Sequence, residues 1–279
     1  MSRFRDVSTV TVFSESWTGV QDVSLDLSGD NFDYSADDNE SIRRVDETKM
    51  AIGLTISVED PDHKRDIYRP VFGSSPQLAL NEVLKISMSE KCQEIKDSSE
   101  DDVWITYVGI TKRVVEADVE VRDFNQLMDE DNFALGDMGR LQFDVFHGSA
   151  LTGLQDRDTY ERFWGLDFTV IGIKPGLKHG DLHSGSISLR GGGDDSNEAQ
   201  IYNEESDGSS TVFEINCGDS GTISFVAPSA DGGSDATVSI ANCVCTGVDI
   251  VATHGGRLER KFSFIAYSSD GQASPITLT

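Results

Sequence analysis

The stretch GGRLERKFSFIAYSSDG, residues 255–271, shows the strongest local pattern in the chain. A glycine turn precedes an alternating apolar run and a second turn closes it, which is typical of one arm of a β-hairpin. Residues 139–148 follow the same design, because GRLQFDVFHG again places an alternating run between Gly-Arg-Leu and a glycine. The sequence therefore predicts a hairpin that occurs twice, with a core made of Leu141, Phe143, Val145, Leu258, Phe262 and Phe264.

Alternation of apolar and polar residues dominates the rest of the chain and predicts a mainly β protein. Glycine is common, with 26 residues, and long helical patterns are scarce, which favours many turns. The predicted strands cover residues 7–13, 20–28, 50–60, 84–92, 103–124 and 139–146 in the first part of the chain, and 165–176, 184–192, 210–218, 221–228, 236–254 and 255–271 in the second.

Four stretches need a separate interpretation. Residues 74–86 carry a proline near their start and predict a short helix, and residues 159–165 predict a short helical linker. The stretch 103–124 is long enough for two strands, or for one strand with a bulge near Gly109. Residues 190–210 are polar and glycine-rich and predict an exposed loop.

The strand series also suggests an internal duplication. In each part, a strand, an acidic loop and a second strand come first, and a long strand region then precedes Gly-Arg-Leu. Identity between the two parts is low, so the match rests on pattern and order. This interpretation divides the chain into a first domain at residues 1–150, a linker at 151–164 and a second domain at 165–279.

The chain is strongly acidic, with 23 Lys and Arg against 49 Asp and Glu and a formal net charge of −26. Residues 1–150 hold 15 basic and 31 acidic residues, and residues 151–279 hold 8 and 18, so both parts carry the excess. Basic residues form only short pairs, whereas nucleic-acid binders cluster Lys and Arg against phosphates. The balance argues against nucleic-acid binding through the general surface. Solubility, adaptation to high salt and repulsion of a polyanion all remain as explanations.

The cysteines and the N-terminus indicate a soluble protein made in a cytoplasm. The four cysteines are few and irregularly spaced, so they predict reduced, half-buried residues and neither a disulfide scaffold nor a zinc site. They are Cys92, Cys217, Cys243 and Cys245. The sequence contains no run typical of a signal peptide and no apolar segment of 18 residues.

The order of these elements resembles the tail tube, or major tail, proteins of long-tailed phages and related viruses. A VSLDLSG strand at residues 23–29, an acidic loop and an LTISVED strand at 54–60 come first. The final part, VDIVATHGGRLERKFSFIAYSSDG at 248–271, carries the resemblance best, because such proteins often end with a strand, a glycine turn and an apolar-aromatic strand.

The resemblance implies two tandem β-sandwich or barrel domains of tail-tube type, each with a short helix. It also implies a structural virion protein whose rings stack into a tail tube, the conduit for genome DNA. For a duplicated chain, trimeric rings with pseudo-sixfold symmetry are expected. Further implied partners are the tape-measure protein and the tail-tip and terminator proteins. The DNA would pass without specific binding, no membrane would take part, and the protein would enter the virion tail after synthesis in the host cytoplasm.

An acidic lumen suits such a conduit, because a wall of cations would hold the DNA through counterion release. The predicted lumen residues are Asp118 and Glu120 in the first domain and Asp249 in the second, since they alternate with valine and isoleucine on predicted strands. An ordinary solvated strand face explains the same alternation. A slip of one residue in register would exchange the lumen face and the core face.

No motif predicts an enzyme, a cofactor or a metal site. Gly-x-Ser-x-Gly, P-loop, His-Glu-x-x-His and dinucleotide-binding patterns do not occur in the sequence. His179 and His183 are four residues apart, but the glycines and the proline around them disfavour the helix that a metal-binding pair would need.

Two alternative functions stay open. The first is another virion ring or decoration protein, such as a tail terminator, a baseplate ring or a capsid decoration. The second is a calcium-binding adhesion module, because residues 30–40 and 191–198 are rich in carboxylates. Neither acidic stretch has the residue order of an EF-hand, and clustered acids more often form a solvated loop.

Overall fold

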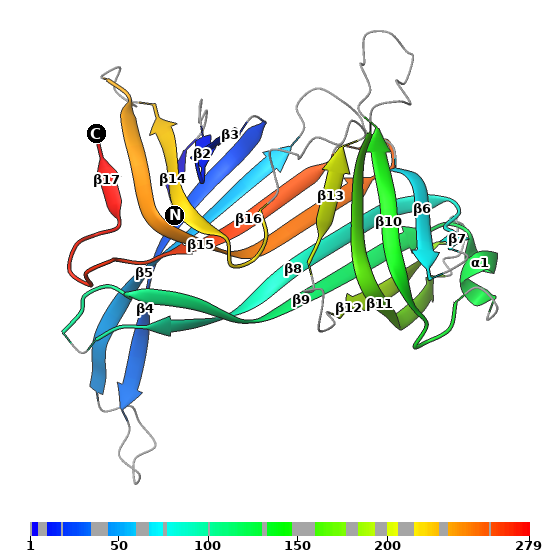
Figure 1. Cartoon of the computed structure of the whole chain (residues 1–279), viewed down its shortest axis with the longest axis horizontal. Coiled ribbons are helices and arrows are strands. Elements are labelled where there is room, and N and C mark those ends of the chain that lie inside the picture. Colours follow the sequence, from blue (N-terminus) through cyan, green and yellow to red (C-terminus); the bar gives the residue numbers. More distant parts are fainter. Residues whose placement is uncertain are drawn as a thin grey trace.

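The computed structural model is mainly β and antiparallel, which confirms the predicted fold class at this level. Strands account for nearly all the regular structure of the described residues, and one short helix lies among them (Figure 1). The structure describes residues 2–4, 10–17, 19–34, 44–59, 67–74, 77–99, 101–129, 133–146, 160–176, 184–192, 200–205, 215–228, 234–256 and 258–279.

The elements of the first part of the chain are β1 (Ser2–Phe4), β2 (Val10–Val12), β3 (Glu15–Trp17), β4 (Val20–Tyr34), β5 (Arg44–Glu59), β6 (Ile67–Gly73), β7 (Leu78–Ala79), β8 (Val83–Asp97), β9 (Tyr107–Val121), α1 (Phe124–Met128) and β10 (Met138–Phe146). Those of the second part are β11 (Tyr160–Gly176), β12 (Ser184–Gly191), β13 (Tyr202–Glu205), β14 (Ser220–Ala227), β15 (Ala236–Thr253), β16 (Glu259–Ala266) and β17 (Ile276–Leu278).

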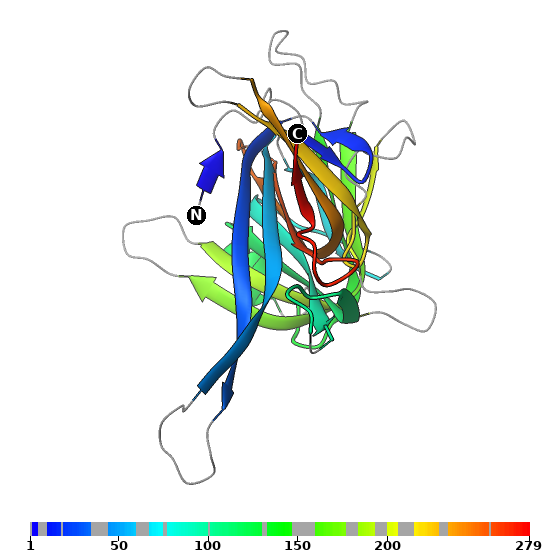
Figure 2. The ribbon, with the colours of Figure 1, turned by 90° about the vertical axis from the view of Figure 1, so that its left-hand side faces the viewer.

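Eight of these strands form one continuous antiparallel sheet, which we call the long sheet. Its order is β4–β5–β16–β15–β8–β9–β12–β11, and every neighbouring pair is antiparallel. At one end of the sheet, β4 and β5 continue together as a two-stranded ribbon that projects from the body (Figures 1 and 2). The long sheet is the element that positions the candidate site described below.

β15 connects the long sheet to a second layer. Its C-terminal half lies between β16 and β8, whereas its N-terminal half lies between β14 and β17. β14 pairs in turn with β2, and β2 pairs with β3. This layer covers β16, because Phe13 meets Phe264 edge-on with ring centroids 5.7 Å apart and Trp17 packs on Phe262 at 4.7 Å.

β11 plays the same role at the other end of the long sheet. Its C-terminal half pairs with β12, and its N-terminal half pairs with β10 on one side and β13 on the other. β10 continues to β6 and then to β7. Gly165 leaves room for the side chains that pack against β11 at this point. A Cβ on this residue would lie 2.3 Å from a ring carbon of Phe168 and 3.3 Å from the methyl group of Met88.

The residues predicted to form the cores of two repeated hairpins are all buried, and they belong to one contiguous cluster. Leu141 and Phe143 have no exposed surface, and Phe262 and Phe264 are each 1% exposed. Val145 and Leu258 are buried in the same cluster. Apolar side chains from both parts of the chain therefore share one core.

Strand pairs also cross the predicted domain boundary. β5 pairs with β16, β8 with β15 and β9 with β12, so hairpins from the two parts alternate along the long sheet. The predicted linker at residues 151–164 overlaps β11 from Tyr160 onward, and its remainder lies outside the described residues. The division into two tandem domains stays a prediction, and strand pairing does not separate the parts at that boundary.

Both predicted helices are wrong. Residues 78–79 form β7 and β8 begins at Val83, with a left-handed backbone at Glu82, where φ is 50°. Residues 160–165 belong to β11. The helix of the first part is α1, which begins at the last residue of the predicted strand region 103–124, and Asp123 caps its first turn by accepting a hydrogen bond from Gln126 N at 3.1 Å. No helix lies in the described residues of the second part.

The predicted repeat of the Gly-Arg-Leu hairpin is also wrong in its pairing. Residues 259–266 form a hairpin with the preceding strand β15, across a turn at Gly255 with φ of 66°. Residues 138–146 instead pair with β11, the strand that follows, and with β6. The physical reason is the connection between β9 and β10, which contains α1 and is too long to fold the two strands directly onto each other.

Candidate functional site

One face of the long sheet carries polar side chains in every strand, and we call it the polar face. Residues that pair directly across antiparallel strands point to the same side of a sheet, so the register defines this face. One cross-strand row runs through all eight strands and is polar throughout. This polar row consists of Asp22, Ser57, Lys261, Asp249, Ser89, Glu116, Arg190 and Thr169.

The adjacent row points to the opposite side and faces the core. It consists of Val23, Ile56, Phe262, Val248, Glu90, Val115, Gly191 and Phe168. All of these residues except Gly191 are buried. A register slip of one residue would bring the polar row into the core, so the burial of this row specifies the register.

The structure brings the three predicted lumen residues together on the polar face. Asp249 is a member of the polar row, and Asp118 and Glu120 lie next to that row on β9. Asp118 is exposed, whereas Glu120 and Asp249 are half-buried. The valines between them on β9 point into the core, as the alternation in the sequence indicates.

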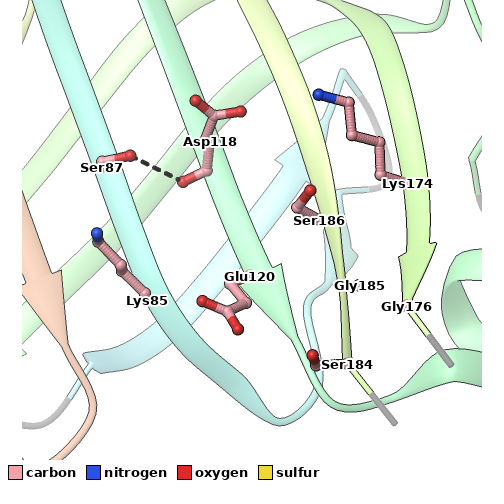
Figure 3. Close-up of a pocket in the computed structure, with 9 residues that line it drawn as sticks. All are labelled: Lys85, Ser87, Asp118, Glu120, Lys174, Gly176, Ser184, Gly185 and Ser186. Carbon is pink, nitrogen blue, oxygen red and sulfur yellow. Dashed lines mark hydrogen bonds between the residues drawn. The ribbon is translucent and has the colours of Figure 1, made fainter. Parts of the chain in front are cut away.

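A depression of about 430 Å³ lies at one end of the polar face, and Asp118 and Glu120 line it (Figure 3). Lys85 of β8 and Lys174 of β11 line the same depression. In Figure 3, Lys85 lies on the β8 side of the two carboxylates and Lys174 on the β11 side. Two cations thus accompany two anions, an arrangement that gives the depression little net charge.

Serine hydroxyl groups hold Asp118 in place. Ser188 Oγ on β12 donates a hydrogen bond to Asp118 Oδ1 at 2.6 Å, and Ser87 Oγ on β8 donates to Asp118 O at 3.5 Å. Each serine is the direct cross-strand partner of Asp118. The carboxylate of Asp118 is therefore oriented by its own sheet.

A second depression, of about 230 Å³, lies on the same face around Asp249. Lys261 is the direct partner of Asp249 on β16, and Glu59 and Glu259 are a second cross-strand pair that lines the depression. This part of the polar face has an excess of negative charge, because Glu59, Asp249 and Glu259 outnumber Lys261. The direct pairing of two glutamates destabilises the sheet modestly.

Acidic residues outnumber basic residues on the polar face, but the basic residues are spread through it. The acids are Asp22, Asp26, Glu59, Glu116, Asp118, Glu120, Asp249 and Glu259, and the bases are Lys85, Lys91, Lys112, Lys174, Arg190 and Lys261. The sequence interpretation named only three of the acids and none of the bases. The same alternation marks all of them, so the signal was present on each strand.

The two end strands of the long sheet have open edges. β1 covers β4 only at residues 23–25, and no described strand pairs with that edge of β4 beyond Leu25. β10 covers β11 up to Thr169, and residues 136–137 bond to Val170. No described strand pairs with that edge of β11 from Ile171 to Gly176. Unpaired strand edges of this kind invite pairing with another chain.

Both open edges expose an aliphatic side chain. Leu27 on β4 is 62% exposed and Ile171 on β11 is 54% exposed. Beside Ile171, a hollow of about 470 Å³ is bordered by exposed Met128 and Leu135. Apolar surface next to an open strand edge is typical of an interaction surface.

A buried ion pair connects the long sheet to the N-terminal half of β11, which lies between β10 and β13. Arg260 of β16 donates hydrogen bonds to both carboxylate oxygens of Glu161 on β11, and both side chains are buried. The guanidinium group also lies over the ring of Phe163, 5.5 Å from its centroid. Sequence reasoning missed this pair, because it assigned Glu161 to the linker and treated Arg260 as part of a short basic pair.

Glu90 is a second buried carboxylate, and it has no surface exposure. Its carboxylate accepts hydrogen bonds from Ile201 N at 3.1 Å and Cys217 N at 2.9 Å. Burial raises the pKa of Glu90, although both backbone donors and the positive charge of Arg113 act in the opposite direction. The alternation of β8 places Glu90 in the core row, but no sequence pattern identifies its partners.

Several sequence predictions fall wholly or largely outside the described residues. His179 and His183 lie there, as do most of the acidic stretches at 30–40 and 191–198. Among the residues that the structure does describe, no group of three or more His, Cys, Asp or Glu side chains has an arrangement that could hold a metal ion. Within the same residues, no helix has the length and apolar character needed to span a membrane.

Comparison with known proteins gives no assignment. No protein-family model matches the chain, and no curated protein or solved structure shows significant similarity to it.

Proposed function

We propose that the chain is a structural virion protein that assembles into stacked rings and forms a viral tail tube. The observation that supports the proposal best is a single antiparallel sheet that has an open edge at each end and a polar row across all its strands. Joining the open edge of one copy to the opposite edge of the next would continue this sheet around a ring.

The direction of the end strands favours such a junction. β4 and β11 are the first and last of eight antiparallel strands, so they run in opposite directions. β4 of one copy would therefore meet β11 of the next in antiparallel orientation, and the ladder would remain regular. Head-to-tail contacts that close by rotation produce rings, and closure removes the exposed edges.

The polar face is the face of the long sheet that would line the lumen. The opposite face cannot do so, because the layer built on β14 and β2 covers it at one end and the layer built on β10 and β6 covers it at the other. An excess of carboxylates would keep DNA phosphates from binding tightly, so the genome DNA would pass without specific binding.

The order of hairpins supports a duplicated chain with two tail-tube-type β domains. From one end of the long sheet, the hairpins are β4–β5, β16–β15, β8–β9 and β12–β11, so they come alternately from the first and second parts of the chain. Each part thus contributes two hairpins, and exchanging β4–β5 with β11–β12 and β8–β9 with β15–β16 gives the same order read from the opposite end. Three such chains would form a ring with pseudo-sixfold symmetry.

The partners of this protein would be further copies of itself, the tape-measure protein, and the tail-tip and terminator proteins. Other virion ring or decoration proteins are the main alternative, because a single ring would use the same edges. The number of copies per particle separates these functions: a tube protein occurs in many rings and a terminator in one. No contact among the described residues favours the calcium-binding adhesion module.

Cysteine cross-linking between the open edges tests the proposal. A chain carrying both Leu27→Cys and Ile171→Cys should form disulfides between neighbouring copies under mild oxidation, in a ladder of covalent species that ends at the trimer. Electron microscopy of the same sample should reveal rings or tubes. A sample that stays monomeric at every concentration and salt, without rings, would refute the proposal.

Single variants provide the matched control. In a head-to-tail contact, Leu27→Cys alone and Ile171→Cys alone place only one cysteine at each junction, so neither should form the ladder. The unmodified chain reports any contribution from its four native cysteines. If rings formed but no cross-links appeared at these edges, the proposed ring assembly would stand and the proposed pairing of β4 with β11 would be wrong.

A further inference from the structure

Three cysteines that are far apart in the sequence meet where β8 separates from β15. The β8–β15 pairing ends at Lys91 and Gly247, so Cys92 is the first residue of β8 beyond it. Cys245 lies on β15 two residues before Gly247, at a β-bulge in the pairing of β15 with β16. The turn that contains Cys217 leads into β14, which pairs with β15 from Val244 onward.

Backbone hydrogen bonds hold Cys217 between the two strands. Its amide donates to Glu90 Oε1 at 2.9 Å, and its sulfur lies 3.7 Å from Glu90 O, two residues before Cys92 on β8. On the other side, Gly218 N donates to Cys245 O and Cys245 N donates to Asp219 O, both at 2.8 Å. The turn is therefore hydrogen-bonded to both β8 and β15.

The three thiols are neighbours in the order Cys92, Cys217, Cys245. Cys217 Sγ lies 3.7 Å from the backbone oxygen of Glu90, which precedes Cys92 by two residues on the same side of β8, and Cys245 Sγ lies 3.7 Å from the backbone oxygen of Gly247. Cys92 is half-buried, whereas Cys217 and Cys245 are fully buried. The fourth cysteine, Cys243, is also buried, but its thiol donates to the backbone oxygen of Ile240 at 3.4 Å.

We propose that Cys92 and Cys217 are a disulfide site that stays reduced in the cytoplasm and is oxidised once the protein meets an oxidising medium. Cys92 is the entry point because it alone among the three thiols has partial exposure. Cys217 is its partner because it is the thiol in contact with Cys92. The bond would link a strand of the first part of the chain to a turn of the second.

The oxidant is a low-molecular-weight disulfide such as oxidised glutathione. The Cys92 thiolate attacks one of its sulfur atoms, forms a mixed disulfide and releases one glutathione thiolate. The Cys217 thiolate then attacks the Cys92 sulfur and displaces the second glutathione. Two protein thiols lose their protons, one disulfide forms in the protein, and the oxidant is reduced to two thiols.

Slow reaction at neutral pH follows from the same contacts. The pKa of Cys92 is raised, first by its hydrogen bond to Cys217 and then by burial, and the pKa of Cys217 is raised mainly by its hydrogen bond to Cys245. Only the thiolate reacts, so a raised pKa lowers the reactive fraction. We therefore expect the rate of oxidation to rise steeply with pH. A reducing cytoplasm would keep the pair as thiols.

Peptide mapping of the whole purified chain tests this site. The protein is incubated with oxidised glutathione at pH 7 and at pH 9, remaining thiols are alkylated in denaturant, and the digest is analysed by mass spectrometry without reduction. We expect one linkage, Cys92 to Cys217, which forms faster at pH 9. We also expect a rise in Tm of roughly 5–10 °C that a reductant reverses, because the bond closes a long loop.

Two serine variants make the test specific. Cys217→Ser should abolish the linkage and the rise in Tm, whereas Cys243→Ser, a matched change at a buried cysteine outside the contact series, should retain both. A Cys217–Cys245 linkage would overturn the assignment of the partner. Glutathione retained on Cys92, or alkylation of both thiols after prolonged incubation at pH 9, would overturn the site. None of these readouts depends on ring assembly.

Discussion

Glu161 and Glu90 are both buried carboxylates, but they are stabilised in different ways. Glu161 meets the guanidinium group of Arg260, which pairs its charge with an opposite one. Glu90 accepts hydrogen bonds from the backbone N–H groups of Ile201 and Cys217. Burial raises the pKa of Glu90 despite these donors. Each carboxylate joins segments that are distant in the sequence, one through an ion pair and the other through backbone donors.

The two links therefore break in different ways. Removing Arg260 leaves the charge of Glu161 buried without its main partner, and such a loss is costly in a low-dielectric interior. The donors to Glu90 belong to the backbone, so no side-chain replacement removes them. The link made by Glu90 fails only when its own acceptor oxygens are replaced.

Arg260→Ala should have the largest effect. It removes the cation from Glu161 and the contact with Phe163, and we expect a loss of about 3–5 kcal/mol in the free energy of unfolding, measured by urea denaturation. Arg190→Ala, at an exposed arginine of the polar row, should change that free energy by less than about 0.5 kcal/mol. Equal losses in the two variants would contradict a special role for the buried pair.

The second effect comes from Glu90→Leu. Leucine fits an apolar core but leaves the amides of Ile201 and Cys217 without their acceptor, at a cost of about 1–3 kcal/mol for each unsatisfied group. Met88→Leu, a change of similar volume on the same strand and face, should cost less than about 1.5 kcal/mol. Hydrogen exchange should also become faster at those two amides in Glu90→Leu alone, and unchanged protection there would argue against the link.

Glu90→Gln should alter the pH dependence of stability by a smaller amount. A carboxyl group whose pKa is raised by folding contributes stability that is present below its unfolded pKa and is lost as pH rises through the folded pKa. The glutamine variant lacks this loss. Its free energy of unfolding minus that of the wild type should therefore increase with pH above the unfolded pKa, as measured by denaturation from pH 4 to pH 8. A difference that is constant or falls would contradict the raised pKa.

Asp118→Asn should have the smallest effect on stability. Asp118 is exposed on the polar face, and asparagine keeps an oxygen that can accept the hydrogen bond from Ser188 Oγ. We expect a change of no more than about 0.5 kcal/mol in the free energy of unfolding. A loss as large as that of Glu90→Leu would mean that the polar face contributes to folding as strongly as the core row does.

Much of the strand pattern could be predicted from the sequence, because alternation is a local property. Phe262 and Phe264 are buried on β16 and Asp249 lies on the polar face, as their spacing indicated. The region near Gly109 contains one strand with a bulge, since β8 and β9 shift register at Gln93 and Glu94, opposite residues 110–112. This agrees with the second of the two expectations for residues 103–124.

The error at residues 159–165 came from interpreting a two-residue period as a helical turn. Glu161, Phe163 and Gly165 are all buried on one side of β11, and a buried glutamate hides the apolar alternation. The glutamate fits there only because Arg260 reaches it from a strand 99 residues away in sequence. No window along the chain contains both residues, so local patterns could not reveal this pair.

The same limit applies to the candidate disulfide site. Cys217 and Glu90 are 127 residues apart, and their contact depends on the point where β8 leaves β15. Irregular spacing predicted reduced, half-buried thiols. The tertiary structure instead brings three of them together, because the turn that contains Cys217 is hydrogen-bonded to both β8 and β15.

Alternation along the sequence marked most of the strands and the apolar side of each, because the side chains of an extended backbone alternate with a period of two. Which strands are neighbours depends on the tertiary structure. It interleaved hairpins from both parts of the chain, assembled the polar row and left open edges at β4 and β11. The physical reason is that strand neighbours are selected by the burial of a shared core and by backbone hydrogen bonds between distant segments, and neither is encoded in any short stretch of sequence.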